Sequence, residues 1–561
     1  MPVVPDISQD LLVNIIEYKA QWLTGHTFMR YPAVNWKEDG YRTLTWGQYS
    51  DTINKVAHWL DEKLGELPQG QTVAYLGPSD ARYSIILPAV IKTNRKILIP
   101  DGRVTREGML NLIHSSECQV WIYPEDDDHQ TCELGIQDMG LKLQAFPPLD
   151  WCLDSNGHER YPYQKKYEEG KNDEIVIIHT SGTTGLPKPI RLTNAYLSTL
   201  TSFRFLSRKY WPRGITYDAF IGKTMLSGCP PQWIGGQMAH IYAPVFLDCS
   251  SIMPPPNEFG LPPANFTRIV QANVVEGILS PPHTITQLYH DPDTLPLLKS
   301  LDYICYAGAP LDLAIGDDLC EHTRLMSIMG ATETGPQVST SPLNKSLWRT
   351  YSFAPENGHR MERIPGSGIA RDGSDDLHEL VIERRPDVEN IFQCAFFNPA
   401  HKYLSRIEVK ELYAPVTDLD GQTRWAFAAR KDDLTKLTWL AKFHAHDIET
   451  RVQQYAENVS HVLVGGEGRP TPYVIVEPKD DTLDENAREA LLDELYSHVV
   501  TRVNEKDIEE ITIPKETVII TKKGKPLQKT AKQTLARKEI EKDYETEIEE
   551  AYERLRKARS R

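Results

Sequence analysis

One short segment of the sequence concentrates residue types that bind phosphate. Residues 179 to 190 read HTSGTTGLPKPI and follow the apolar run EIVIIH. Gly182 and Gly185 let backbone N–H groups turn inward without a Cβ clash, and consecutive inward N–H groups form an anion-binding concavity. Hydroxyl donors and one cation complete the set: Thr180, Ser181, Thr183, Thr184 and Lys188. The segment predicts a polyphosphate-binding loop, and the alternative is a surface turn between a strand and a helix.

The order of strands and helices indicates where this loop lies. QTVAYLG, KILIP, CQVWIYP and EIVIIH have the composition of short buried strands, and YSDTINKVAHWLDEKL has apolar residues at helical spacing. Alternating strands and helices predict an α/β fold in which helices flank parallel sheets. Ligands bind beyond the carboxyl ends of such strands, and Ser181 lies at one of these ends.

The pattern changes along the chain, and we predict two domains, residues 1–431 and 432–561. The shorter strands HELVIE and RWAFAAR precede the boundary. After it, DIETRVQQYAENV, VSHVLVGG and PTPYVIVEP form the pattern of a compact α+β module. The charged terminal segment has an apolar stripe at helical spacing, made by Ile540, Tyr544, Ile548, Tyr552 and Leu555. We expect this helix to dock on its own domain, and the alternative is a helix that binds a partner or begins a linker.

The overall composition narrows the class of protein. The chain has 561 residues and a formal net charge of −16, which disfavours nucleic acid as a partner. Eight cysteines without a C-x-x-C pair favour reduced thiols in the cytoplasm. The sequence begins without a signal-peptide pattern, and no apolar run is long enough to span a membrane.

Two distant motifs together resemble a known superfamily. TSGTTGLPKP resembles the phosphate loop of adenylate-forming enzymes, and MGATETG, Met329 to Gly335, resembles their second signature. GYRTLTWGQYS, YAGAPL, ARKDD and KTAKQTLARKE look like the adenylation domains of fungal NRPS-like enzymes and carboxylic acid reductases, over nearly the whole chain. The sequence lacks a carrier-type serine motif and a dinucleotide fingerprint, so we expect a free-standing adenylation enzyme of secondary metabolism.

The resemblance implies ATP-dependent activation of a carboxylic acid as an acyl-adenylate, with release of pyrophosphate. The loop from Thr180 to Lys188 would hold the β- and γ-phosphates, Thr332 would contact the α-phosphate, and Glu333 would bind Mg²⁺. The residues that would line the nucleotide are Gly308, Ala309, Pro310, Met329, Gly330 and Ala331. The resemblance also implies a distorted β-barrel in the large domain and a small domain that rotates about a hinge at Asp432.

Three further roles carry alternatives. In the enzymes that the chain resembles, an Asp followed by Leu, an aromatic and then a Pro binds the ribose. The counterpart KELYAP implies Glu411 for this role, Asp418 is the alternative, and Arg430 is expected to reach the ribose or a phosphate. The same resemblance implies a lysine that acts in the adenylating pose. Its match KTAKQT makes Lys532 the candidate, and the neighbouring rivals are Lys529 and Lys525.

Several residues bear on the kind of acid that is activated and on the group that accepts it. The predicted acid pocket favours an aromatic or medium apolar acid and is lined by Trp233, Gly235, Gly236, Ala307 and Met329. Trp439 and Leu440 stand where relatives have small residues, so they are expected to obstruct a thiol arm unless the loop folds outward. Three hypotheses remain: transfer to CoA or to phosphopantetheine on a separate carrier protein, transfer to an amine, and a degenerate scaffold without catalysis.

Overall fold

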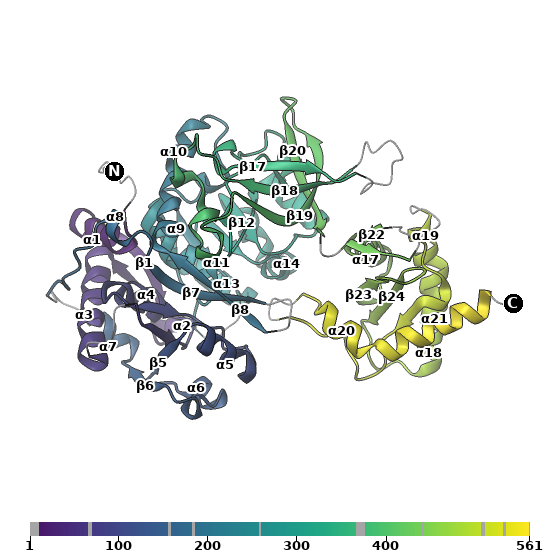
Figure 1. Cartoon of the computed structure of the whole chain (residues 1–561), viewed down its shortest axis with the longest axis horizontal. Helices are drawn as coiled ribbons and strands as arrows, with labels where there is room; N and C mark the ends of the chain where they lie inside the picture. Colours follow the sequence, from purple (N-terminus) through teal and green to yellow (C-terminus); the bar gives the residue numbers. More distant parts are fainter. Residues whose placement is uncertain are drawn as a thin grey trace. The chain divides into compact units, whose positions relative to one another are not determined.

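The computed structural model describes residues 10–65, 70–154, 159–181, 186–256, 260–365, 376–431, 434–438, 442–505, 511–530 and 534–559. The chain divides into two compact units (Figure 1). The first comprises Met1–His359, Ile382–Ile407 and Thr417–Arg424, and the second comprises Arg360–Val381, Glu408–Val416 and Trp425–Arg561. The second unit therefore takes in segments that precede the predicted boundary at 432. That boundary lies outside the described residues and stays a prediction.

The first unit is built on two mainly parallel sheets. One has the strand order β13-β12-β11-β9-β10-β1-β2, and the other has the order β6-β5-β3-β4-β7-β8. Neighbouring strands are parallel except in the pairs β1–β2 and β7–β8. The bounds are β1 Thr27–Pro32, β2 Tyr41–Thr45, β3 Thr72–Tyr75, β4 Lys96–Leu98, β5 Cys118–Pro124, β6 Lys142–Phe146, β7 Glu174–Ser181, β8 Pro187–Thr193, β9 Thr224–Ser227, β10 Ser250–Ile252, β11 Gly277–Ser280, β12 Tyr303–Ala307 and β13 Arg324–Ile328.

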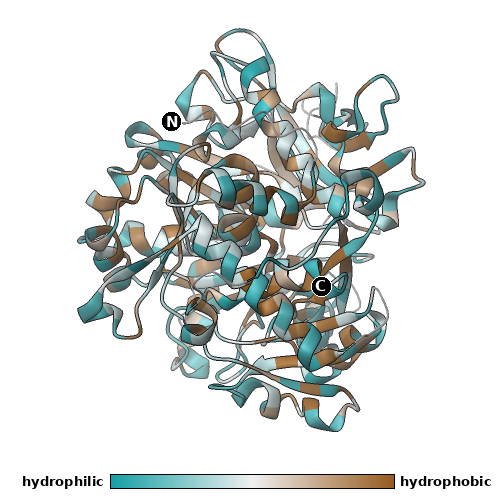
Figure 2. Ribbon diagram, turned by 90° about the vertical axis from the view of Figure 1, so that its left-hand side faces the viewer, coloured by the Kyte–Doolittle hydropathy of each residue, from teal (hydrophilic) through white to brown (hydrophobic). Residues whose placement is uncertain are grey.

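Helices cover these sheets, most of them with one buried face, whereas every residue of α4, Arg82–Lys92, is buried. The longer ones are α1 Leu12–Trp22, α3 Trp46–Leu64, α4 Arg82–Lys92, α5 Arg106–Ser115, α13 Pro263–Ala272, α14 Pro282–His290 and α16 Leu313–His322. A capping box starts α3: the Thr45 hydroxyl accepts from the Gln48 amide, and the Gln48 side chain accepts from the Thr45 amide. Figure 2 shows hydrophobic and hydrophilic residues mixed along most helices, as expected where one face is buried. The predicted α/β architecture is confirmed.

A third, five-stranded sheet has the order β16-β20-β19-β18-β17. Its bounds are β16 Thr350–Tyr351, β17 His359–Arg363, β18 His378–Glu383, β19 Arg406–Thr417 and β20 Thr423–Arg430. The predicted strands HELVIE and RWAFAAR correspond to β18 and β20. Each of the long strands β19 and β20 has residues in both units.

The second unit contains a three-stranded sheet with helices on both faces. The sheet has the order β23-β24-β25, with bounds Val459–Gly465, Tyr473–Pro478 and Val518–Ile520. Alternate strand residues point to opposite faces. Val462, Val464 and Val474 pack with α17 Ala445–Tyr455 and α18 Glu485–Leu495, whereas Leu463 and Ile475 pack with α20 Arg537–Asp543 and α21 Glu545–Arg559.

The terminal segment docks on its own unit, as predicted. All five residues of the predicted stripe are buried in the cluster beneath α20 and α21. The helix is not continuous, however, because Tyr544 interrupts it with a backbone ψ of 12°. The stripe still forms one surface because Tyr544 is itself fully buried.

Two further expectations can be compared with the structure. All eight cysteines are free thiols. Among the helices in the described part of the chain, none combines the length and the apolar character needed to cross a bilayer.

Candidate functional site

The predicted phosphate-binding segment forms a β-hairpin. It joins β7 to the antiparallel β8, so the alternative of a turn between a strand and a helix is wrong. Thr180 lies directly opposite Lys188 in this pair, and opposite residues of an antiparallel pair project from the same face. Lys188 is exposed. The predicted tip residues Gly182, Thr183, Thr184 and Gly185, and the side chain of Ser181, lie outside the described residues.

The second signature forms a tight hairpin after β13. β14 Gly330–Ala331 pairs with β15 Gly335–Pro336, and Thr332 and Glu333 occupy the tip. Gly330 must lack a side chain, because a Cβ there would lie 2.7 Å from the Gly335 carbonyl oxygen. Thr180 Oγ1 donates to Glu333 Oε1 at 3.1 Å. The two signatures therefore meet in the first unit.

Two side chains hold the backbone of this tip. Tyr196, in α9 Asn194–Ser198, donates its hydroxyl to the Thr332 carbonyl at 3.0 Å. Asn398 Nδ2 donates to the Glu333 carbonyl at 2.8 Å. Tyr196 and Asn398 are both buried. The backbone of the tip is thus fixed by buried hydrogen bonds, while the Thr332 and Glu333 side chains are only half-buried.

His401 is a candidate residue that sequence reasoning missed. It ends the turn η9 Pro399–His401, which packs beside β8, and its Nδ1 lies 3.1 Å from the Ala395 carbonyl oxygen. Burial lowers the pKa of His401, the charge of Glu333 raises it and the charge of Lys188 lowers it. The imidazole therefore lies within electrostatic range of both predicted site residues. The segment NPAHKY carries no signature that could have identified it.

The predicted nucleotide-lining residues follow β12 and β13. Gly308 adopts φ +90°, which a side chain would strain, and nothing lies within 4 Å of its Cβ position. Ala309 is half-buried and Pro310 is exposed in the same turn. Met329 follows β13, and its carbonyl accepts from the Gln337 amide at 2.9 Å. These turns leave the parallel sheet at the carboxyl ends of neighbouring strands, where ligand sites are expected.

The predicted acid-pocket residue Trp233 is held by polar contacts. Its Nε1 donates to Asp101 Oδ2 at 2.8 Å, and the Arg103 guanidinium lies 5.0 Å from its ring centroid. Gly235 and Gly236 follow in α11 Ile234–Gln237, where a Cβ on Gly236 would lie 2.0 Å from the Pro230 carbonyl oxygen. Close packing of this helix start thus explains at least one of the two glycines.

A cavity of about 280 Å³ lies beside this segment. Its walls follow the carboxyl ends of β3, β4, β9 and β10, and include Ser79, Asp101, Gly228, Gln232, His240 and Met253. None of the five predicted acid-pocket residues is among its walls. Ala307 lies instead at the end of β12.

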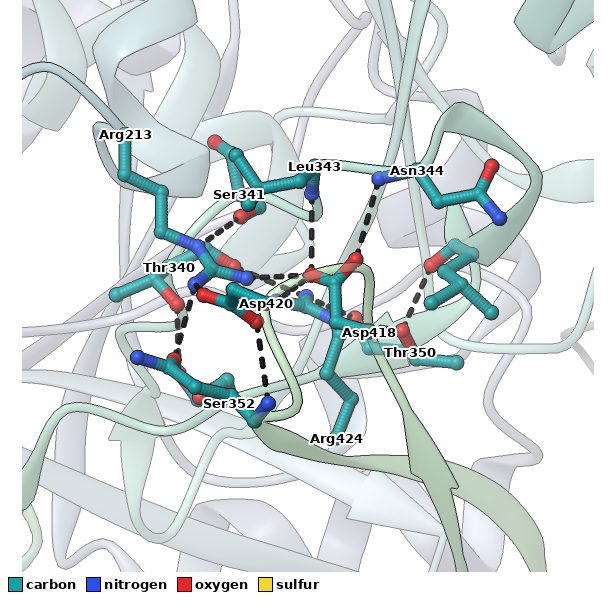
Figure 3. A network of polar contacts seen from close by, with 12 residues as sticks. Arg213, Thr340, Ser341, Leu343, Asn344, Thr350, Ser352, Asp418, Asp420 and Arg424 are labelled. Atoms are coloured by element: carbon teal, nitrogen blue, oxygen red, sulfur yellow. Dashed lines mark hydrogen bonds and ion pairs between the residues drawn. The ribbon is translucent and has the colours of Figure 1, made fainter.

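Asp418 has a structural environment (Figure 3). Its carboxylate forms an ion pair with Arg213 and accepts from the backbone amides of Leu343 at 3.1 Å and Asn344 at 3.2 Å. Burial would raise the pKa of Asp418, but these amide hydrogen bonds and the Arg213 charge outweigh burial and lower it. Arg424, fully buried, lies 3.8 Å away. With its oxygens engaged in this way, Asp418 is the weaker candidate for binding ribose.

Glu411 and Arg430 lie in the second unit, on β19 and β20. Glu411 is half-buried and accepts from the Tyr413 hydroxyl at 2.8 Å. Burial raises the pKa of Glu411, whereas the Tyr413 hydrogen bond and the charge of Arg430 lower it. Arg430 is exposed. Within the described part of the chain, Glu411 Oε1 accepts no hydrogen bond, whereas both carboxylate oxygens of Asp418 are engaged.

The predicted lysine of the small domain cannot be placed, because Lys532 lies outside the described residues. The rival Lys525 is engaged: its Nζ donates to both Glu547 carboxylate oxygens at 3.0 Å and lies 4.2 Å from the Tyr544 ring centroid. Lys529 is exposed. The predicted hinge Asp432 and the bulky pair Trp439 and Leu440 are also outside the described residues.

The donor set fits a magnesium nucleotide. In the described ranges no cluster of three or more His, Cys, Asp or Glu side chains could hold a metal alone. Mg²⁺ commonly binds through one or two carboxylates together with substrate phosphates. Glu333 offers such a carboxylate beside the hairpin that carries Lys188.

Comparisons with known proteins give consistent matches. The sequence profile described as AMP-binding enzyme matches residues 22–359, and that of the AMP-binding enzyme C-terminal domain matches residues 432–556. A carboxylic acid reductase of Neurospora crassa is 25% identical over 563 residues, covering 98% of this chain and 51% of that protein. The isocyanide synthase-NRPS hybrid crmA of Aspergillus fumigatus is 25% identical over 528 residues, covering 91% of this chain and 31% of that protein.

The chain thus spans about half the length, or less, of these curated relatives. Among solved structures, ATP-bound MatB from Rhodopseudomonas palustris superposes with a TM-score of 0.66 at 15% identity. The superposition covers 95% of this chain and 99% of that one, and it shows a common fold.

Proposed function

The chain belongs to the AMP-binding enzyme family, and on this premise we propose that it activates a carboxylic acid with ATP. A carboxylate oxygen of the acid attacks the α-phosphorus of ATP, the bond to the β-phosphate oxygen breaks, and acyl-adenylate and pyrophosphate form. Such phosphoryl chemistry depends mainly on positioning and on electrostatic stabilisation.

The observation that carries this proposal is the meeting of the two signatures. Thr180 bonds Glu333, and Lys188 lies opposite Thr180 on the same face of the hairpin. Lys188 supplies a positive charge for the phosphates, and Glu333 holds the magnesium ion. The ion, when bound, neutralises phosphate charge. The exposed Gly308 turn and Met329 flank the base, and Thr332 contacts the α-phosphate.

Other parts of the proposal concern the second unit. Glu411 accepts from the ribose hydroxyls and Arg430 supports it. Lys532 acts in an adenylating pose that the second unit reaches by rotation about Asp432. The ion pair of Lys525 with Glu547 supports Lys532 over Lys525, and that of Asp418 with Arg213 supports Glu411 over Asp418.

For the second step, we propose transfer of the acyl group to the thiol of CoA or of a phosphopantetheine carrier. The relatives named as a carboxylic acid reductase and an NRPS hybrid support a carrier. The bulk of Trp439 and Leu440 supports the alternative of an amine acceptor.

The deciding experiment is acid-dependent ATP–pyrophosphate exchange over a panel of aromatic and aliphatic acids. We expect the unmodified protein to catalyse ATP–pyrophosphate exchange with at least one acid, and Lys188→Ala to lose this activity. If no acid supports exchange while the protein is folded and binds ATP, the degenerate-scaffold hypothesis replaces the proposal. Adding CoA, a phosphopantetheinylated carrier or an amine to an active acid then identifies the acceptor.

A further inference from the structure

The helical segment after Trp233 carries two buried polar atoms without a partner. α11 continues into the π-helical turn η4 Met238–Tyr242, and π-helical turns occur often at functional sites. Among the residues that the structure describes, neither Gln237 Nε2 nor His240 Nε2 has a hydrogen-bond partner. Both residues are 1% exposed. Because buried polar groups are nearly always paired, these two atoms call for hydrogen-bond partners that the described protein atoms do not supply.

Both atoms are hydrogen-bond donors. The Tyr242 hydroxyl donates to Gln237 Oε1 at 2.6 Å, which fixes the orientation of the side-chain amide. The unpaired atom of Gln237 is therefore the NH₂ group at Nε2. His240 Nδ1 lies 2.7 Å from Ser251 Oγ. Among the described residues, this nitrogen is the only acceptor within reach of the buried Ser251 hydroxyl. Ser251 therefore donates to Nδ1, which leaves the ring proton on Nε2. Burial lowers the pKa of His240 to about 4, so the ring stays neutral near pH 7.

The segment borders the place where the carboxylate would be activated. Tyr196 donates to the Thr332 carbonyl, and its raised pKa, due mainly to burial, has further contributions from Tyr242 and Glu333. Tyr242 in turn bonds Gln237. A chain of near neighbours thus runs from the second signature to Gln237, and His240 lies three residues further along in the π-helical turn.

His240 is one of the wall residues of the cavity of about 280 Å³, and Gln237 lies three residues before it in the chain. The other walls are partly apolar, with Cys229, Met253 and prolines. The charged wall residues Asp101 and Arg103 are paired with each other, with Arg103 Nε 2.9 Å from Asp101 Oδ1. The cavity thus offers neutral donors and apolar contact, and a second ionised group of a ligand would find no unpaired charge among these described walls.

We propose that the activated acid carries a neutral acceptor oxygen remote from its carboxylate, and that His240 Nε2–H and Gln237 Nε2–H donate to it. Hydroxyl, alkoxy and carbonyl oxygens have this chemistry. This inference rests on the proposed function and names its substrate class. It refines the expectation of an aromatic or medium apolar acid, because the sequence pattern could not indicate that these two donors lack protein partners.

The test uses matched pairs of acids in ATP–pyrophosphate exchange. Each pair differs by one oxygen remote from the carboxyl group, as in benzoate against its hydroxy and methoxy derivatives, and hexanoate against 5-oxohexanoate. For at least one pair, kcat/KM of the unmodified protein should be 10-fold or more higher for the oxygen-bearing acid. Equal or lower values for every oxygen-bearing partner would overturn the inference while leaving the proposed function intact. A preference for dicarboxylic acids would also overturn it.

Variants then test the two residues. His240→Phe and Gln237→Leu should each remove most of the preference by raising KM for the oxygen-bearing acid, with little change for its partner. His240→Gln, whose amide nitrogen can replace Nε2, should retain the preference, and the exposed His283→Phe is the matched control. A preference unchanged in folded Gln237→Leu and His240→Phe would refute the assignment. Absence of exchange with every acid would instead refute the proposed function itself.

Discussion

Thr180 and Glu333 are 153 positions apart in the chain and are joined by a hydrogen bond of 3.1 Å between Oγ1 and Oε1. Thr180 is the penultimate residue of β7 in the phosphate hairpin, and Glu333 occupies the tip of the second signature. The bond orients a carboxylate toward the face of the hairpin that carries Lys188. A single contact therefore links the proposed phosphate-binding and metal-binding groups.

We predict that Lys188→Ala and Glu333→Gln each reduce pyrophosphate exchange by about 10²-fold or more, the usual effect of removing one preorganised electrostatic contact. The fold should persist, because Lys188 is exposed and the backbone around Glu333 is held by Tyr196 and Asn398. Circular dichroism and thermal unfolding check the fold, and exposed Lys37→Ala is the control. Exchange at the parental rate in either variant would show that its role is wrong.

Asp418→Asn should lower the free energy of unfolding and leave nucleotide binding unchanged. Removing one partner of a buried ion pair typically costs about 3–5 kcal/mol, and Asp418 faces Arg213 with its side chain fully buried. The lowered pKa of Asp418 means that its stabilisation is present above the unfolded-state pKa and is lost as pH falls through the folded-state pKa. Urea unfolding between pH 3 and pH 7 should show a smaller loss of stability at low pH in the variant. Nucleotide affinity of the folded variant should equal that of the parent.

Glu411→Gln should show the opposite pattern, with weakened ATP binding and little change in stability. A carboxylate accepts from two ribose hydroxyls, whereas an amide offers one acceptor oxygen. Because the pKa of Glu411 is raised, ATP affinity of the parent should begin to fall at a higher pH than an ordinary glutamate would cause, and this component should vanish in the variant. Calorimetric titration with ATP between pH 5 and pH 8 measures both. An ATP affinity unchanged in Glu411→Gln would show that another residue binds the ribose.

Sequence reasoning identified the strands and the signatures because their signals are local. EIVIIH and QTVAYLG are buried in parallel sheets as their apolar runs indicate, and the family resemblance is confirmed by the profile matches. The environments of Asp418 and Lys525 could not be predicted, since each depends on a partner from a distant segment, Arg213 and Glu547. His401 was missed for the same reason.

For the second unit, we predict that Lys532→Ala slows adenylate formation but spares a reaction started from pre-made acyl-adenylate, because the lysine serves only the adenylating pose. Lys525→Met should instead lower the thermal stability of the unit and leave the ratio of the two half-reactions unchanged, since Lys525 binds Glu547 in α21. Stopped-flow assays of the two half-reactions separate these effects. Equal loss of both half-reactions in Lys532→Ala would show a structural role.

The last prediction concerns His401. Its Nδ1 faces the Ala395 carbonyl, while the ring lies within electrostatic range of Lys188 and Glu333. If the second ring nitrogen supports the phosphates or the residues that bind them, its removal should raise the KM for magnesium ATP about 10-fold, on the scale of one hydrogen bond to a charged group. His401→Asn keeps a donor near Nδ1 and removes Nε2, whereas His401→Phe removes both. We expect both variants to raise this KM, with KM for the acid unchanged and with a loss of thermal stability only in the phenylalanine variant. A normal KM for ATP in His401→Asn would show that His401 only ties η9 to Ala395 and has no part in nucleotide binding.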